Sequence, residues 1–217
     1  MADETVQDRA LVRVWDPVVR IGHWVLVAGF AIAYITEGEP EWLHSWAGYA
    51  IAITVAARIV WGLIGPKHAR FTGFVTGPAA VIAYLKDLVS GKADRHLGHS
   101  PAGGAMTVAL LAMLALTTYS GMATLAAEEG EGPLAGVIAQ SERTERVGDT
   151  LPDAYEREGH DEDEEHEGGE SNWEEIHESA ANITLFLIFL HIGGVLLASM
   201  VHRENLAHSM VTGDKRA

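Results

Sequence analysis

Four long apolar stretches alternate with polar segments along the chain. They cover residues 17–36, 43–64, 103–127 and 177–201. A helix needs about 20 residues to cross the hydrocarbon layer of a bilayer, which is ~30 Å thick. The pattern therefore predicts an all-α integral membrane four-helix bundle, formed by a single domain over residues 1–217, with both termini on one side of the membrane.

A shorter apolar pattern lies between the second and third spans. In GPAAVIAYLKDLVSGK, residues 77–92, apolar side chains recur at helical spacing, and Lys86 and Asp87 lie opposite them. This pattern is typical of an amphipathic helix in the membrane interface. The first span is expected to begin at Pro17 after a capping Asp16, and the second to end at GLIGP.

Charge is divided between one acidic insert and a neutral remainder. Residues 128–175 hold 18 Asp and Glu against three Arg, which accounts for the whole net charge of -15. The insert has too much charge and too few aromatic residues to bury a core, so we expect it to be mostly disordered. Lys and Arg gather in the N-terminal arm, the link between the second and third spans and the tail. By the positive-inside rule, both termini are cytoplasmic and the insert is periplasmic in a bacterial inner membrane.

The chain contains no cysteine. This excludes disulfides, iron–sulfur clusters, thiolate zinc sites and covalently attached c-type haem. The first fifteen residues contain no apolar core of a cleavable signal peptide, so we expect the first span to direct its own insertion. Metal or redox chemistry must therefore use histidine, methionine or carboxylate side chains.

Four histidines lie within or at the ends of the apolar spans: His23, His44, His177 and His191. An ionisable residue in a membrane segment is a candidate functional residue when a partner can be named. His177 and His191 are 14 residues apart, which places them about 40° apart around one helix and roughly 21 Å apart along it. His44 starts the second span at the level of His177, and His23 lies near the level of His191. Two facing pairs at two depths predict two bis-His b-type haems.

Two arginines are candidate partners of the haem propionates. Arg58 lies 14 residues after His44 on the same helix face, so it reaches the level of the inner haem. Arg20 lies one turn before His23, where its side chain reaches either a propionate or the lipid headgroups.

Other histidines carry weaker signals. His202 is an alternative to His191 as the inner ligand. His99, in GHSPAGG, is interpreted as part of a turn. His160 and His166 lie in the insert and are interpreted as solvated residues, with a loose divalent-cation site as the alternative.

Six stretches of the chain resemble the bacterial di-haem b-type cytochromes of the b561 type, which include the cytochrome b subunits of membrane-bound nickel hydrogenases. They are VWDPVVRIGHW, LHSWAGY, RIVWGLIGPKHARF, YLKDL, GHSPAGGAM and HESAANITLFLIFLHIGGVLLASMVHRENLAHSMVTGDKR. The resemblance implies two haems, ligated by His23, His44, His177 and His191, that pass electrons between the quinone pool and a protein partner. The insert exceeds the family pattern and indicates a separate basic partner, such as a periplasmic c-type cytochrome.

Three functions remain open from the sequence. The first is transmembrane electron transfer by an independent cytochrome. The second is the membrane-anchor cytochrome b subunit of a larger oxidoreductase such as a hydrogenase. The third is a divalent-metal transporter that uses the intramembrane histidines and the acidic loop. Membrane lipid, quinone and a basic redox protein are the expected partners, and nucleic acid is not.

Overall fold

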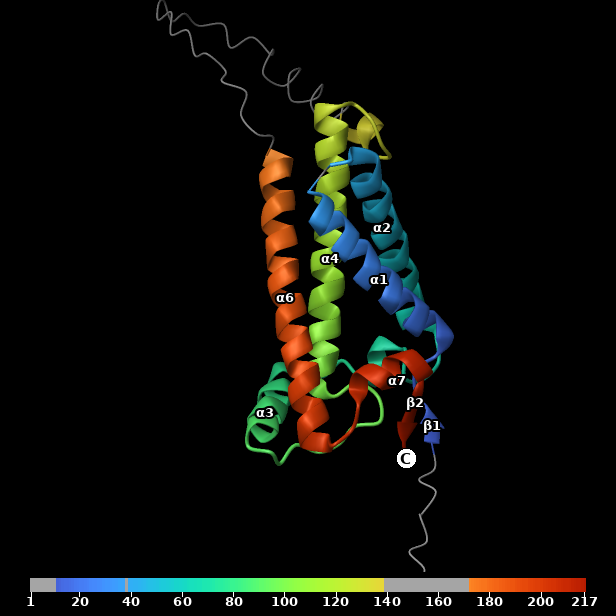
Figure 1. Ribbon diagram of the computed structural model, residues 1–217, viewed down its shortest axis with the longest axis vertical. Helices are drawn as coiled ribbons and strands as arrows, with labels where there is room; N and C mark the ends of the chain where they lie inside the picture. Colours follow the sequence, from blue (N-terminus) through green and yellow to red (C-terminus); the bar gives the residue numbers. More distant parts are fainter. Residues whose placement is uncertain (1–10, 38, 139–171) are drawn as a thin grey trace, which may run out of the picture.

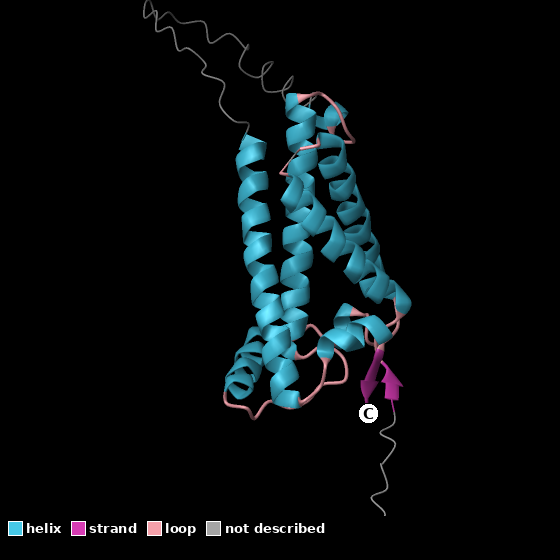
Figure 2. Ribbon diagram, in the orientation of Figure 1, coloured by secondary structure: helices cyan, strands magenta, loops and turns pink. Residues whose placement is uncertain are grey.

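The computed structural model describes residues 11–37, 39–138 and 172–217. Most of these residues are helical, as Figure 2 shows. The predicted disorder of the insert concerns mainly residues 139–171. These residues, with His160 and His166 among them, lie outside the described part of the chain.

Four of the helices are long and apolar enough to cross a membrane. They are α1 (Pro17–Thr36), α2 (Glu41–Ile64), α4 (Pro101–Glu128) and α6 (Asn172–His202). The predicted spans agree with these helices to within a few residues (Figure 1). The Asp16 carboxylate accepts hydrogen bonds from the N–H groups of Val18 and Val19, as expected of a cap. α2 ends at Ile64, and its C-cap is Gly65, where a Cβ would lie 2.5 Å from the carbonyl oxygen of Trp61.

Short elements close one end of the bundle, which we call the terminal end. They are β1 (Leu11–Arg13), the 3-10 turn η1 (Phe71–Gly73), α3 (Pro78–Val89), α7 (Leu206–Thr212) and β2 (Asp214–Arg216). β1 and β2 pair antiparallel, so the two ends of the described chain meet there (Figures 1 and 2). The opposite end, where α1 and α4 finish and α2 and α6 start, is called the insert end.

The amphipathic helix expected at residues 77–92 forms as α3. It buries Tyr84 and Leu88, while Ile82, Leu85 and Val89 are exposed. The protein thus covers one side of α3 and leaves a second apolar side uncovered. That arrangement is compatible with a place in the membrane interface, which stays a prediction.

A buried ionic network ties the tail to the terminal end. Both oxygens of Glu204 accept hydrogen bonds from Arg95, and the Nζ atom of Lys215 lies 3.7 Å from Glu204. Lys215 also donates to the carbonyl oxygen of His96. Burial alone would raise the pKa of Glu204, but the hydrogen bond from Arg95 and the charge of Lys215 outweigh it and hold the pKa below its ordinary value. The network joins the segment before α4 to the last strand.

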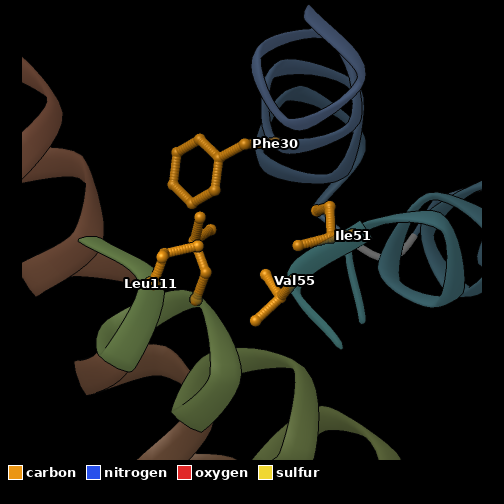
Figure 3. Packing of buried hydrophobic residues seen from close by; sticks show 5 residues of the cluster. Phe30, Ile51, Val55 and Leu111 are labelled. Atoms are coloured by element: carbon orange, nitrogen blue, oxygen red, sulfur yellow. The ribbon is translucent and has the colours of Figure 1, made fainter. Parts of the chain in front are cut away.

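The apolar core lies among α1, α2 and α4. Figure 3 shows Phe30, Ile51, Val55 and Leu111 pointing toward one another from these three helices. α6 packs mainly along α4, and neither α1 nor α2 packs extensively against it. Side chains bridge the remaining distance, for example in the hydrogen bond from the Tyr34 hydroxyl to Oδ1 of Asn182. The candidate ligands lie along this boundary between α6 and the α1–α2 pair.

Candidate haem sites

His44 and His177 face each other at the insert end. Their ring centroids are 5.9 Å apart and the ring planes make an angle of 79°. Metal–nitrogen bonds to histidine are about 2 Å long, so two imidazoles that would hold one metal ion between them would have ring centroids roughly 6 Å apart. The structure therefore brings this predicted pair to the separation that bis-His ligation requires.

Both of these imidazoles are held by backbone carbonyl groups. The Nδ1 atom of His44 lies 3.0 Å from the carbonyl oxygen of Ala33, and Nδ1 of His177 lies 2.8 Å from that of Thr117. A carbonyl oxygen can only accept, so each Nδ1 carries the proton and each Nε2 is left as a free electron-pair donor. This is the tautomer that a metal ligand needs.

The surface of α4 is shaped to receive the His177 ring. A Cβ at Gly121 would lie 2.8 Å from Cε1 of His177, so only glycine leaves room for the imidazole there. The hydroxyl of the fully buried Ser120 lies 3.4 Å from Nδ1 of the same ring. One turn away, the hydroxyls of Thr117 and Thr184 are 3.2 Å apart and join α4 to α6. These contacts fix the position of His177.

His23 and His191 form the second predicted pair, nearer the terminal end. They lie on α1 and α6, close enough for their imidazoles to interact electrostatically. The Nδ1 atom of His23 is enclosed and has no hydrogen-bond partner in the described structure. Within the described residues, His23 thus lacks the carbonyl support that holds each histidine at the insert end.

Four side chains in the terminal half of the bundle leave buried nitrogens without hydrogen bonds. Among the described residues these atoms are Nε of Arg20, Nδ1 of His23, both terminal nitrogens of Arg58 and Nδ1 of His99. Unpaired buried polar groups are costly, and guanidinium groups bind carboxylates especially well. Two haem propionates would supply carboxylate acceptors, so the donor set fits a haem with its propionates at this level.

The two predicted arginines have different surroundings. Arg58 lies over the ring of Phe71, with Cζ 5.2 Å from the centroid, and is otherwise free to bind an anion. Arg20 donates to the carbonyl oxygen of Val211 and lines a groove of about 490 Å³ between α1 and α7. A propionate and a lipid headgroup both stay predictions for Arg20.

A family model described as prokaryotic cytochrome b561 matches residues 14–213. The chain belongs to the prokaryotic cytochrome b561 family. It is therefore a multi-pass membrane protein that binds b-type haem and transfers electrons. No curated protein and no solved structure matches the chain.

Two other histidines of this b561-family chain have informative positions. Nε2 of His202, the alternative inner ligand, lies 3.3 Å from the hydroxyl of Tyr84 on α3. His99 was interpreted only as part of a turn, yet its ring packs against Trp15 and Phe74 beside the unpaired donors. A histidine directly before the helix start SPAGG was the available signal, but sequence spacing could not show what it faces.

The insert end of this b561-family protein is acidic in its described residues as well. The charge of Glu41 is the largest of several causes that raise the pKa of Glu129, and Glu131 adds to it. Glutamates from the start of α2 and the end of α4 thus lie close enough to repel one another. The negative field predicted for the insert therefore extends onto the bundle itself.

Proposed function

We propose that this chain carries electrons across the membrane through two bis-His b-type haems, between the quinone pool and a basic periplasmic redox protein. His44 and His177 hold one haem, and His23 and His191 hold the other. The observation that carries the proposal is the 5.9 Å separation of His44 and His177, with both Nδ1 atoms committed to backbone carbonyls. A b-type haem supplies one-electron redox chemistry when bound.

The chain's own residues set the level of each site. α6 is one continuous helix of 31 residues that carries both His177 and His191. Fourteen residues of helix correspond to roughly 21 Å, so the two sites lie at different depths in the bilayer. Arg58 neutralises propionate charge at the second site, and the bundle excludes water from both.

The charge of the acidic insert indicates a basic protein as the redox partner. Residues 128–175 carry the entire net charge of the chain and lead directly into α6 and His177. A field of one sign raises the encounter rate of an oppositely charged protein by about 10 to 10³, and salt screens it over ~8 Å at physiological ionic strength. By the distribution of Lys and Arg, the insert is periplasmic and both termini are cytoplasmic. A cation-rich c-type cytochrome would therefore be delivered beside the haem at the insert end.

Quinol-driven reduction of the purified protein tests the function directly. We expect quinol to reduce both haems, and a basic c-type cytochrome then to reoxidise them in a second-order reaction. Replacing residues 156–170 by a neutral linker should slow the second step and flatten its salt dependence, while haem content and quinol reduction stay unchanged. The matched control carries residues 156–170 in shuffled order, which preserves the charge. An unchanged rate at low salt with the neutral linker would contradict the role of the insert.

If the chain is instead an anchor subunit, it should purify as part of a larger complex. Family membership alone is compatible with a cytochrome b that serves a larger oxidoreductase, and stable co-purification with such a partner would favour it. The transporter alternative gains no support from the described residues, because no group of three or more His, Cys, Asp or Glu side chains among them could hold a metal ion. A colourless purified protein would nevertheless restore it.

A further inference from the structure

His99 is built into the protein interior just before α4. The edge of its ring meets Trp15 at a centroid distance of 4.8 Å, and its face tilts over Phe74 at 4.2 Å. Trp15 and Phe74 are themselves buried, and Nδ1 of His99 is enclosed without a hydrogen-bond partner in the described structure. The imidazole is therefore fixed in orientation while one of its polar atoms is left unsatisfied.

An unbroken series of ring contacts connects His99 to Arg58. Arg58 lies over Phe71, Phe71 meets Phe74 at 5.7 Å, and Phe74 meets His99. Close packing with α2 and α4 positions both phenylalanines. A Cβ at Gly62 would collide with the Phe71 ring, and one at Gly104 would lie 2.6 Å from the carbonyl oxygen of Phe74. The two unsatisfied side chains are thus held on one rigid cluster.

The electrostatic surroundings of His99 favour an anionic partner. The groups that act on it most strongly are Arg58, Lys215, His191 and His68, and all of these are cationic or neutral. The carboxylate oxygen of Asp16 near Arg58 is already shared by the α1 cap and the indole N–H of Trp61. Burial, with Arg58 and Lys215, lowers the pKa of His99 to about 3. The imidazole is therefore neutral at physiological pH and can donate a hydrogen bond without adding charge.

We propose that His99 is a further cofactor-binding residue of the terminal-end site and donates a hydrogen bond to a propionate carboxylate of the haem held by His23 and His191. It acts beside Arg58, which provides the charge. The inference rests on the proposed function, since it requires a haem at this level. The alternative is a purely structural role, in which His99 only fills the space between Trp15 and Phe74.

Two substitutions separate these roles. His99→Phe keeps a flat ring between Trp15 and Phe74 but removes the donor, whereas His99→Gln keeps a neutral donor. His96→Phe is the matched control, because His96 lies in the same segment, and its ring contacts Tyr84 instead of the cluster. All three are made in the full chain, purified with haem.

The main readout is the redox-difference infrared spectrum with haem labelled by ¹³C at the propionate carboxyls. His99→Phe should shift one labelled carboxylate band and speed the transfer of one haem to apomyoglobin about tenfold, as expected when a hydrogen bond to an anion is lost. His99→Gln should restore the wild-type transfer rate, and His96→Phe should match wild type. Wild-type bands and transfer rates in His99→Phe would overturn the proposal.

The proposal can still be tested if His99→Phe does not bind both haems fully. The haem at the insert end serves as an internal reference, and if the other haem fails to load, His99→Gln must restore it while His99→Leu must not. Equal loading by Gln and Leu would also overturn the proposal. A wild-type protein with a single haem would instead refute the proposed function, and two haems in His191→Ala would refute its assignment of His191 as a ligand.

Discussion

The two candidate haem sites differ in how the protein supports them. At the insert end, carbonyl groups hold both histidines and a glycine makes room for one ring. At the terminal end, Nδ1 of His23 and nitrogens of Arg58 and His99 have no hydrogen-bond partner among the described residues. The comparison shows that protein contacts alone prepare the first pair of ligands. We expect the second site to be completed by an anionic group, as proposed above.

The electrostatic surroundings differ in the same way. The insert end carries clustered glutamates, whereas the terminal end carries the guanidinium group of Arg58, whose terminal nitrogens have no hydrogen-bond partner among the described residues. Negative charge favours the oxidised, more positive iron, and positive charge favours the reduced one. We therefore expect the haem at the insert end to have the lower potential of the two.

The largest effect should come from removing a ligand, because each ligand belongs to only one of the two sites. His44→Ala and His177→Ala should each lose the same haem, and His23→Ala and His191→Ala should each lose the other, because a bis-His site with one ligand holds haem poorly. Haem-to-protein stoichiometry with redox titration checks this. If His191→Ala keeps both haems while His202→Ala loses one, the assignment of the terminal-end site is wrong.

Gly121→Ala tests whether the room left by Gly121 positions His177 at the insert end. The added Cβ would displace the His177 ring, so we expect this site to bind haem about tenfold more weakly while the terminal-end haem is unaffected. Gly193→Ala is the control, since a Cβ there meets nothing within 4 Å and alanine favours the helix. Haem transfer rates measure both. Equal behaviour of the two variants would show that Gly121 has no special role.

Arg58→Gln tests whether positive charge raises the potential of the terminal-end haem. Loss of a positive charge should lower the potential of the terminal-end haem by tens of millivolts, where about 59 mV corresponds to a tenfold change for one electron. The other haem should hardly shift. Arg70→Gln, an exposed position at the same end, is the control. Redox titration that finds equal shifts of both haems would remove Arg58 from the propionate role.

The smallest effect concerns the ionic network behind the terminal-end site. The pKa of Glu204 is lower in the folded state, so its carboxylate stabilises the fold above its ordinary pKa of 4.5, and this contribution is lost as the pH falls through the folded value. Glu204→Gln should therefore cost roughly 1 to 3 kcal/mol at pH 7 and less at pH 4. Thermal unfolding in detergent measures the difference. Asp214→Asn, which removes a pair with the exposed Arg13 at 3.7 Å, should change little.

Sequence patterns predicted the spans and the Asp16 cap because these depend on local hydropathy and local hydrogen bonding. They also paired His44 with His177, since helical periodicity fixes the depth and face of each residue. They did not predict the ring cluster around His99 or the partners of Glu204. Those contacts join residues far apart in the chain, and no periodicity records which loop folds over which helix.

The pairing of β1 with β2 has a consequence for the order of assembly. Leu11, before the first span, pairs with Arg216, which is synthesised after the fourth span. Trp15, which covers His99, is likewise held by Ser209 of α7. During synthesis the terminal-end site thus stays open after all four spans have been made. We therefore expect the folding of residues 206–216 against residues 11–15, and not insertion of the fourth span, to be the step that encloses the proposed terminal-end haem.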